Sequence, residues 1–175
     1  MSSTSPIAVT ADVLDSLLDI QPGSALHGVR HARDKVALAT QSSHNLFFAQ
    51  DLGIDLSLTE RLWVAYFAAR LTPQATLCAY YLKALQAQGI DSDGLALIDA
   101  GKLDELNDGR LAAILRFTRT LIESPVHGDR AALQALQQQG LSTGEIVVLA
   151  QLIAFLSYQV RLAAGLSALS ATGAA

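Results

Sequence analysis

The side chains best suited to chemistry gather at one helix start, in the stretch RLTPQATLCAYYLKAL at residues 70–85. It holds Cys78, the only cysteine of the chain, and the tyrosine pair Tyr80 and Tyr81. A thiolate is a strong nucleophile, and the free amides of a helix N-terminus favour it. A tyrosine hydroxyl can donate to a carbonyl or carboxylate, but it is a poor proton relay because it titrates far above neutral pH. The alternative for both tyrosines is structural packing, and for Cys78 an inert buried thiol.

Glu60 and Arg161 are the charged candidates. Glu60 stands in SLTE (57–60), where a capping box with Ser57 explains it and a proton relay is the functional alternative. Arg161 stands in the apolar stretch YQVRLAAGL. A buried arginine needs a carboxylate or several carbonyls, so we expect an ion pair with Glu60 or Glu145, and an anion clamp is the alternative.

Three neutral candidates complete the set of site residues. Gln74 and Gln159 are amides with few polar neighbours, and each either orients a ligand or links helices. His44, in QSSHNLFF, lies outside the stretch 70–85, and we treat it as a candidate that enters a ligand pocket from another helix. We expect no metal, because His27 and His31 share a helix face but no Glu-x-x-His motif or cysteine stands near them, and the charged neighbours Arg30, Arg33 and Asp34 indicate a solvated face.

Size and composition indicate a single domain, residues 1–175, that associates with itself. Of its 175 residues, 51% are hydrophobic and 16% charged, and the mean hydropathy is +0.33. So much apolar surface predicts a homo-oligomer. The formal net charge of −4 and the absence of a basic stripe argue against nucleic acid as a partner. No Gly-rich phosphate loop or paired catalytic carboxylates are found, so we expect no cofactor.

The compartment is expected to be the cytoplasm. A lone cysteine suits a reducing environment, and the N-terminus lacks the basic and apolar segments of a signal peptide. The longest apolar run, 146–158, is interrupted by Gln151 and is too short to span a bilayer. We therefore expect no membrane association.

The elements that must position these residues are all helical, because no convincing alternating strand pattern is present. Thr72 is the expected N-cap of the helix that carries Cys78, with Pro73 at its first position. Residues 1–8 are expected to be a loose tail. The expected helices run over about 11–20, 24–50, 57–70, 73–88, 93–100, 109–123, 130–139 and from 142 onward.

An internal repeat relates two of these segments, with units at about 51–89 and 136–170. Residues 56–79 align without gaps on 141–164, and nine positions are identical. Both segments open with a Leu-Ser-x-x-Glu capping box, and Gln74 aligns with Gln159. We interpret this as a duplication, with two helical units packed about a pseudo-twofold axis.

Three stretches that cover most of the chain resemble a known family. They are LSLTERLWVAYFAARLTPQATLCAYY (56–81), GLSTGEIVVLAQLIAFLSYQVRLAAGLSAL (140–169) and, more weakly, PGSALHGVRHARDKVALATQSSHNLFF (22–48). The sequence resembles the carboxymuconolactone decarboxylase and alkylhydroperoxidase-D-like superfamily. The first stretch is like its Leu-Ser-x-x-Glu helix before a redox motif, and the second is like its closing helix. The resemblance implies an all-helical bundle that forms dimers, trimers or hexamers.

The family's redox motif is missing its cysteines here. Redox members carry Cys-x-x-Cys-x-x-x-His at a helix N-terminus, where the second thiol resolves the oxidised first one. Aligned on Arg-Leu, the two cysteine positions fall on Gln74 and Leu77, and the histidine position on Tyr81. A register counted from Glu60 supplies no cysteine either. Cys78 misses by one residue, which turns it by about 100° on a helix.

Three functions stay open at this point. The first is a member of the superfamily without dithiol chemistry that binds or acts on a small organic molecule, as decarboxylase-type members work without the cysteine pair. The second is a one-cysteine hydroperoxide reductase that uses Cys78 and an external thiol. The third is a non-catalytic oligomeric protein that binds a partner.

Overall fold

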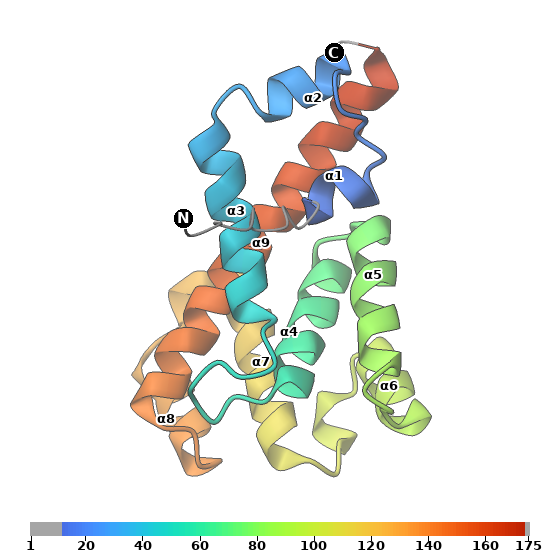
Figure 1. The fold of residues 1–175 in the computed structure, drawn as a ribbon. Coiled ribbons are helices and arrows are strands. Elements are labelled where there is room, and N and C mark those ends of the chain that lie inside the picture. Colours follow the sequence, from blue (N-terminus) through green and yellow to red (C-terminus); the bar gives the residue numbers. More distant parts are fainter. Residues whose placement is uncertain (1–11, 174–175) are drawn as a thin grey trace, which may run out of the picture.

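The computed structural model describes residues 12–173 and confirms an all-α fold, with no strand among these residues (Figure 1). The tail expected at 1–8 lies outside the described residues. Two short 3₁₀ helices, η1 (Leu103–Glu105) and η2 (Pro125–His127), interrupt the connections. The α-helices are α1 (Val13–Leu17), α2 (Ala25–Arg30), α3 (Asp34–Phe47), α4 (Leu58–Leu71), α5 (Ala75–Gln86), α6 (Ser92–Asp99), α7 (Gly109–Glu123), α8 (Arg130–Gln138) and α9 (Thr143–Thr172).

Helix α4 is the centre of the bundle. Its nine consecutive residues from Arg61 to Ala69 are all buried. A helix that is apolar on every face must be surrounded, and α5, α7 and α9 surround it here. The main hydrophobic core forms around α4 and includes Trp63, Phe67, Leu85, Leu115 and Leu156.

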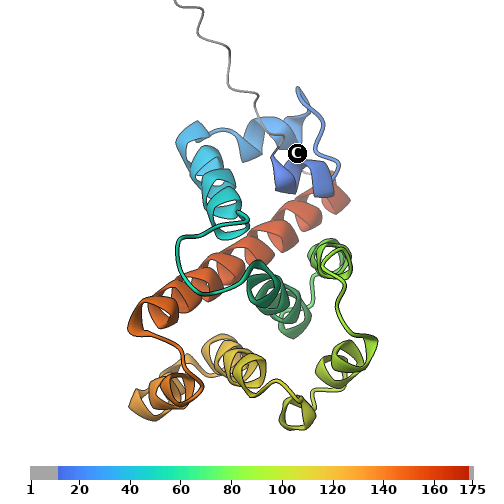
Figure 2. The ribbon, with the colours of Figure 1, turned by 60° about the horizontal axis from the view of Figure 1, so that its bottom comes forward.

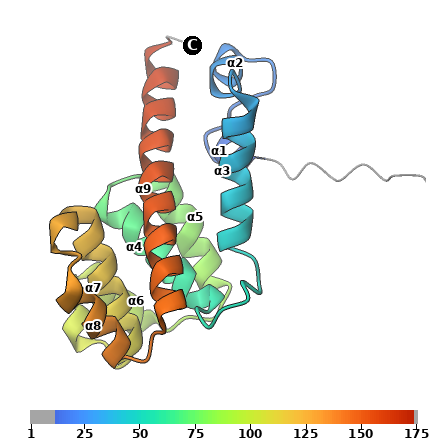
Figure 3. The same ribbon diagram turned by 90° about the vertical axis from the view of Figure 1, so that its left-hand side faces the viewer.

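Helix α9 is the long axis on which both parts of the molecule rest. Figure 2 shows α1–α3 on one side of α9 and α4–α8 on the other. Figure 3 shows that α4–α8 gather around the first half of α9, whereas α2 lies beside its last turns. Those last turns contact a second, small cluster formed by Ile20, Leu26 and Leu166.

The length of α9 corrects one step of the sequence argument. The apolar run was expected to be too short for a bilayer, but α9 has 30 residues, or about 45 Å. By length and composition it is the one helix among the described residues that is able to cross a membrane. Half of its most apolar window is buried inside the protein, and core helices of soluble proteins pass the same test.

The helix expected over 24–50 is two helices. Ser24 caps α2 and accepts from the His27 amide at 3.1 Å, but α2 ends at Arg30 and α3 begins at Asp34. At this end, Arg30 and His31 are held by carboxylates of α1, with His31 Nε2 at 2.6 Å from Asp15 Oδ2. Pairing with α1 thus accompanies the break, and it depends on tertiary contacts that the local pattern does not contain.

The start of α5 also differs from the expectation. Thr72 does not cap α5 but ends α4, with its amide donating to the Ala68 carbonyl. Pro73 lies in the connection rather than in the helix. Gln74 is the N-cap, because its side-chain oxygen accepts from the Leu77 amide at 2.7 Å. A long amide side chain therefore does the work usually given to Ser, Thr or Asp.

Candidate functional site

A buried hydrogen bond joins two of the predicted site residues. Tyr81, on α5, donates its hydroxyl to Gln159 Oε1, on α9, at 2.6 Å. Tyr81 is 0% and Gln159 1% exposed, so solvent does not reach the pair. Burial raises the pKa of Tyr81 well above its ordinary value. The tyrosine is therefore a neutral donor that links two helices, and it does not relay protons.

His44 and Tyr80 form a second pair beside the first. The Tyr80 hydroxyl lies 3.4 Å from His44 Nε2, a long hydrogen bond, and the rings of Tyr80 and Tyr81 meet edge to face at 5.0 Å. His44 is buried, and burial lowers its pKa. Its Nδ1 has no hydrogen-bond partner among residues 12–173. The structure thus brings together His44, Tyr80, Tyr81 and Gln159, four uncharged groups at neutral pH.

Gln74 and its aligned residue Gln159 have different roles. The Gln74 side chain caps α5 and accepts a hydrogen bond from the Leu77 amide. Gln159, by contrast, lies in the middle of α9 and bonds across to α5. The two glutamines therefore do not form a matched pair around one ligand.

Cys78 is not placed for activation. It is the fourth residue of α5, and its amide already donates to the Gln74 carbonyl at 3.0 Å. Burial raises the pKa of the Cys78 thiol, and the negative charge of Asp99 adds to this, while Arg70 acts in the opposite direction. Asp99 in turn bonds Arg70 at 3.2 Å and accepts from the Tyr66 hydroxyl at 2.7 Å. These surroundings favour the protonated, unreactive thiol.

Glu60 belongs to an ion-pair cluster that the sequence reasoning missed. It closes the capping box of α4 with Ser57 and also accepts from Arg110 Nε at 2.7 Å. Arg110, on α7, donates to Glu145 at 2.5 Å as well. Glu145 closes the capping box of α9, so one arginine joins the first turns of both capped helices. The Glu60 carboxylate is therefore engaged by Ser57 and Arg110 in a structural role.

The charges of this cluster reinforce one another. Burial alone would raise the pKa of Glu145, but its bonds from Ser142 and Arg110 outweigh this and leave the pKa below its ordinary value. Burial alone would lower the pKa of Arg110, but Glu145 and Glu60 outweigh it and raise the pKa. The cluster is thus a stable charged clamp and not a proton relay.

The expectation for Arg161 is wrong. Arg161 is exposed and donates to the Ser157 carbonyl of its own helix at 2.8 Å, and Arg110 takes the pairing with Glu60 and Glu145. Arg30 and Arg61 are buried instead. Arg61, 1% exposed, donates to the carbonyls of Leu56, Phe47 and Ala49. Its apolar neighbours Val160 and Ala163 belong to the main core, whereas Arg161 itself is exposed.

Arg161 lies in a groove between α2, α3 and α9. The volume of the groove is about 600 Å³, and Arg33 and Arg161 line it together with Tyr158. The Tyr158 hydroxyl bonds Thr40 at 3.0 Å. The apolar wall of the groove consists of Val29, Ala32, Val36, Leu162, Leu166 and Leu169.

Comparison with known proteins adds no assignment: no protein-family model matches the chain, and no curated protein matches it. The family resemblance therefore depends on the sequence stretches that carry it.

Proposed function

We propose that this chain is a member of the carboxymuconolactone decarboxylase and alkylhydroperoxidase-D-like superfamily that has lost dithiol chemistry and binds a small organic anion. Two Leu-Ser-x-x-Glu helices, α4 and α9, support the family proposal. The lone Cys78, with a raised pKa, supports the loss of dithiol chemistry. The filled interior around Tyr81 and Gln159 leaves no exposed surface on either residue for a ligand, so we place the ligand elsewhere.

The groove between α2, α3 and α9 carries the binding proposal. Arg33 and Arg161 line it, and no carboxylate among residues 12–173 forms an ion pair with either. The third arginine of the groove, Arg30, is already paired with Asp12 at 3.3 Å. Two unpaired guanidinium groups beside an apolar wall are the single observation on which the binding proposal depends.

The ligand class follows from this lining. A guanidinium presents parallel N–H donors that match a carboxylate. The side chains of Val36, Leu166 and Leu169 offer apolar contact to an alkyl or aromatic body. A volume of about 600 Å³ accommodates a molecule of modest size. We therefore expect an apolar carboxylic acid rather than a sugar or a nucleotide.

Isothermal titration with decanoate tests the proposal, with decanol as the uncharged control. Decanoate should bind and decanol should bind more weakly. Arg161→Gln should weaken decanoate binding about tenfold, since one charge-assisted hydrogen bond is lost. Arg130→Gln is the matched control, because Arg130 is exposed and forms no ion pair among residues 12–173.

Three results would contradict this assignment. Failure of decanoate to bind the wild-type chain excludes the apolar-anion class. Equal weakening by Arg161→Gln and Arg130→Gln shows that general surface charge, and not the groove, attracts the ligand. Turnover of an organic hydroperoxide that stops in Cys78→Ser would replace the proposal with the one-cysteine peroxidase.

We also infer that the chain forms a homo-oligomer through the outer faces of α3 and α9. These faces expose the apolar side chains of Leu38 (65%), Leu46 (60%) and Val147 (51%), which a partner subunit would cover. Sedimentation velocity of the wild-type chain should show an oligomer, and Leu38→Lys should shift it toward the monomer. A monomeric wild-type chain would refute the assembly but not the groove.

A further inference from the structure

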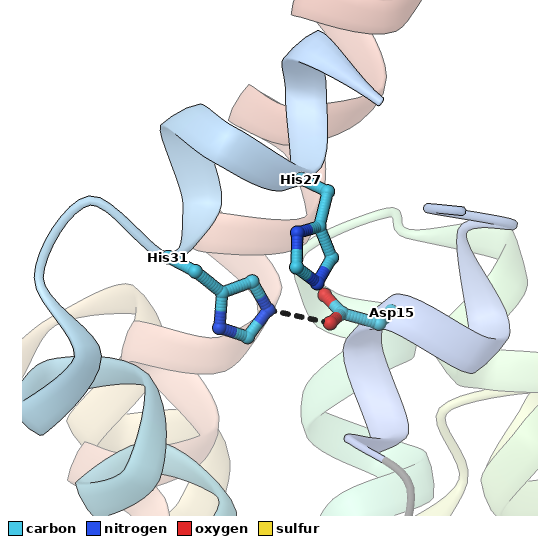
Figure 4. Close-up of side chains that lie close together, drawn as sticks. All are labelled: Asp15, His27 and His31. Carbon is cyan, nitrogen blue, oxygen red and sulfur yellow. Dashed lines mark hydrogen bonds and ion pairs between the residues drawn. The ribbon is translucent and has the colours of Figure 1, made fainter. Parts of the chain in front are cut away.

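Three metal-ligand side chains from two helices meet at the outer end of the molecule. Figure 4 shows Asp15, on α1, with its carboxylate beside the imidazole rings of His27 and His31. His27 belongs to α2 and His31 is its C-cap, and the His31 amide donates to the His27 carbonyl at 2.9 Å. That helical turn stacks the two rings with centroids 4.3 Å apart. The sequence showed the histidine pair, but only the fold adds the carboxylate.

The spacing of the ligand atoms suits one ion. One ring nitrogen of each histidine and a carboxylate oxygen of Asp15 all lie within 4.8 Å of one another. Ligands bound to zinc at about 2.0–2.1 Å in a tetrahedron stand roughly 3.3 Å apart. His31 Nε2 and Asp15 Oδ2 lie closer, at 2.6 Å, in a hydrogen bond. To bind an ion in place of the shared proton, these two atoms have to move apart by only about 0.7 Å.

The Asp15 carboxylate has unused capacity for a cation. Its Oδ1 is buried and has no hydrogen-bond partner among residues 12–173. Arg30 Nε lies 4.0 Å from this oxygen and is also without a hydrogen-bond partner in the described chain. A buried carboxylate oxygen without a donor is costly, and a bound cation would satisfy it.

The outer shell holds the three ligands in place. Asp12 caps α1 through the amides of Leu14 and Asp15 and pairs with Arg30 at 3.3 Å. The two N-caps, Asp12 and Ser24, therefore fix the helices that carry the ligands. Such outer partners orient ligands in known metal sites.

The site opens into a cavity that leaves room for further ligands. This cavity, of about 440 Å³, is lined by Asp15, His27 and His31 and also by Asp12, Ser16 and Asp19. Oxygen atoms from these walls or water can complete the coordination. Two imidazoles and one carboxylate favour Zn²⁺ and related transition metals over Mg²⁺ and Ca²⁺, which prefer oxygen.

We propose that Asp15, His27 and His31 form a binding site for Zn²⁺ that joins α1 to α2. The ion replaces the proton shared by Asp15 and His31 and adds His27 as the third protein ligand. This site is separate from the groove of the proposed function, so either proposal stands if the other fails.

Zinc titration of the untagged full-length chain tests this site, by calorimetry and by metal analysis after dialysis. The wild-type chain should bind one Zn²⁺ and should melt at a higher temperature with Zn²⁺ than without it. His27→Gln and Asp15→Asn should each weaken binding by about tenfold or more. Mg²⁺ should not compete. His127→Gln is the matched control, because His127 is exposed and lies elsewhere on the chain.

The outcomes separate a built site from general metal binding. Circular dichroism of each variant shows whether its helices remain, and Asp15→Asn keeps an acceptor for His31. A wild-type chain that retains no Zn²⁺ after dialysis overturns the proposal. So does a folded His27→Gln or Asp15→Asn variant that binds as tightly as the His127→Gln control.

Discussion

The segments that begin at Leu56 and Leu141 start alike and then diverge. In both, a serine caps the helix, a glutamate closes the capping box, and Arg110 binds that glutamate. After Leu71 the first segment breaks and α5 starts at Ala75, whereas α9 continues through the aligned residues to Thr172. Pro73 stands at the break. It has no backbone N–H to donate within a helix, and it disfavours the helical conformation of the residue before it. Its aligned residue in α9 is Tyr158, which has no such restriction.

This difference shows that an aligned residue does not keep its task when the backbone around it changes. After the break, Gln74 turns back to cap its own helix. Without a break, Gln159 projects from the side of α9 and reaches Tyr81. The shared capping boxes are local and survive, whereas the roles of the glutamines depend on where the helix goes. We propose that the two segments share an origin and that α9 lost, or α4–α5 gained, the break.

Introducing a proline into α9 at the position aligned with Pro73 should have the largest effect on stability. Tyr158→Pro removes a helical amide hydrogen bond from the middle of α9 and should cost about 3 kcal/mol or more of unfolding free energy. Tyr158→Ala is the control, since it removes only the side chain and its bond to Thr40. Urea denaturation measures both. Equal losses in the two variants would show that α9 already tolerates a break there.

Removing the shared clamp should have the next largest effect. Arg110→Met leaves Glu60 and Glu145 without their partner, and the Glu145 side chain is only 7% exposed. The expected loss is about 2–3 kcal/mol, below that of a fully buried pair because Arg110 is partly exposed. Arg116→Met, which breaks the exposed pair with Asp104, should cost under about 1 kcal/mol. Similar losses from both would mean that the clamp does not hold α4 and α9.

The clamp also predicts an acid dependence. The pKa of Glu145 is below its ordinary value in the folded chain. Its contribution is therefore present above the unfolded pKa and is lost as the pH falls through the lowered pKa. The unfolding free energy of Glu145→Gln should therefore change less with pH over this range than that of the wild-type chain, as measured by circular dichroism. An unchanged acid profile would remove Glu145 from the explanation.

The two glutamines offer a finer test. Tyr81→Phe leaves the buried Gln159 oxygen without its donor and should cost about 1–2 kcal/mol. Gln74→Ala removes an N-cap and should cost about 1 kcal/mol or less. Thermal unfolding ranks the pair. A larger loss from Gln74→Ala would mean that the cap, and not the link between helices, is the more important use of glutamine.

The smallest effect is expected at Cys78, which aligns with Ala163. Cys78→Ala should change stability by less than about 1 kcal/mol. Because burial raises its pKa, the native thiol should react with iodoacetamide more slowly than glutathione does at pH 8. Rapid alkylation of the folded chain would instead indicate an activated cysteine.

The helix ends that depend on local chemistry were predictable from sequence. Asp108 caps α7 and Asp129 caps α8, and Gly140 follows α8 with a φ of 84°. These signals work because a side chain bonds amides two or three residues away. The break in 24–50 was not predictable, because it accompanies pairing with α1.

The site was less predictable than the fold. Arg110 lies 50 residues from Glu60 and 35 from Glu145, so no local pattern links it to either. Arg161 was assigned to the interior because its neighbours in sequence are apolar, but on a helix those neighbours face other directions. Asp15 carried no signal beside two distant histidines. Such groupings arise from packing, which one sequence without its fold does not reveal.

The unequal support along α9 has a consequence for how the molecule opens. The main core includes residues of α9 as far as Ala163, whereas the last turns contact a second cluster with only three buried residues, Ile20, Leu26 and Leu166. Regions with few buried contacts undergo local unfolding at lower free energy than the whole domain. Amide deuterium exchange should therefore quicken along this one continuous helix, with slow exchange near Leu152 and fast exchange beyond Leu166. The last turns of α9 can therefore open and close locally together with α2, while the bundle, which includes Leu14 of α1 in its core, stays folded.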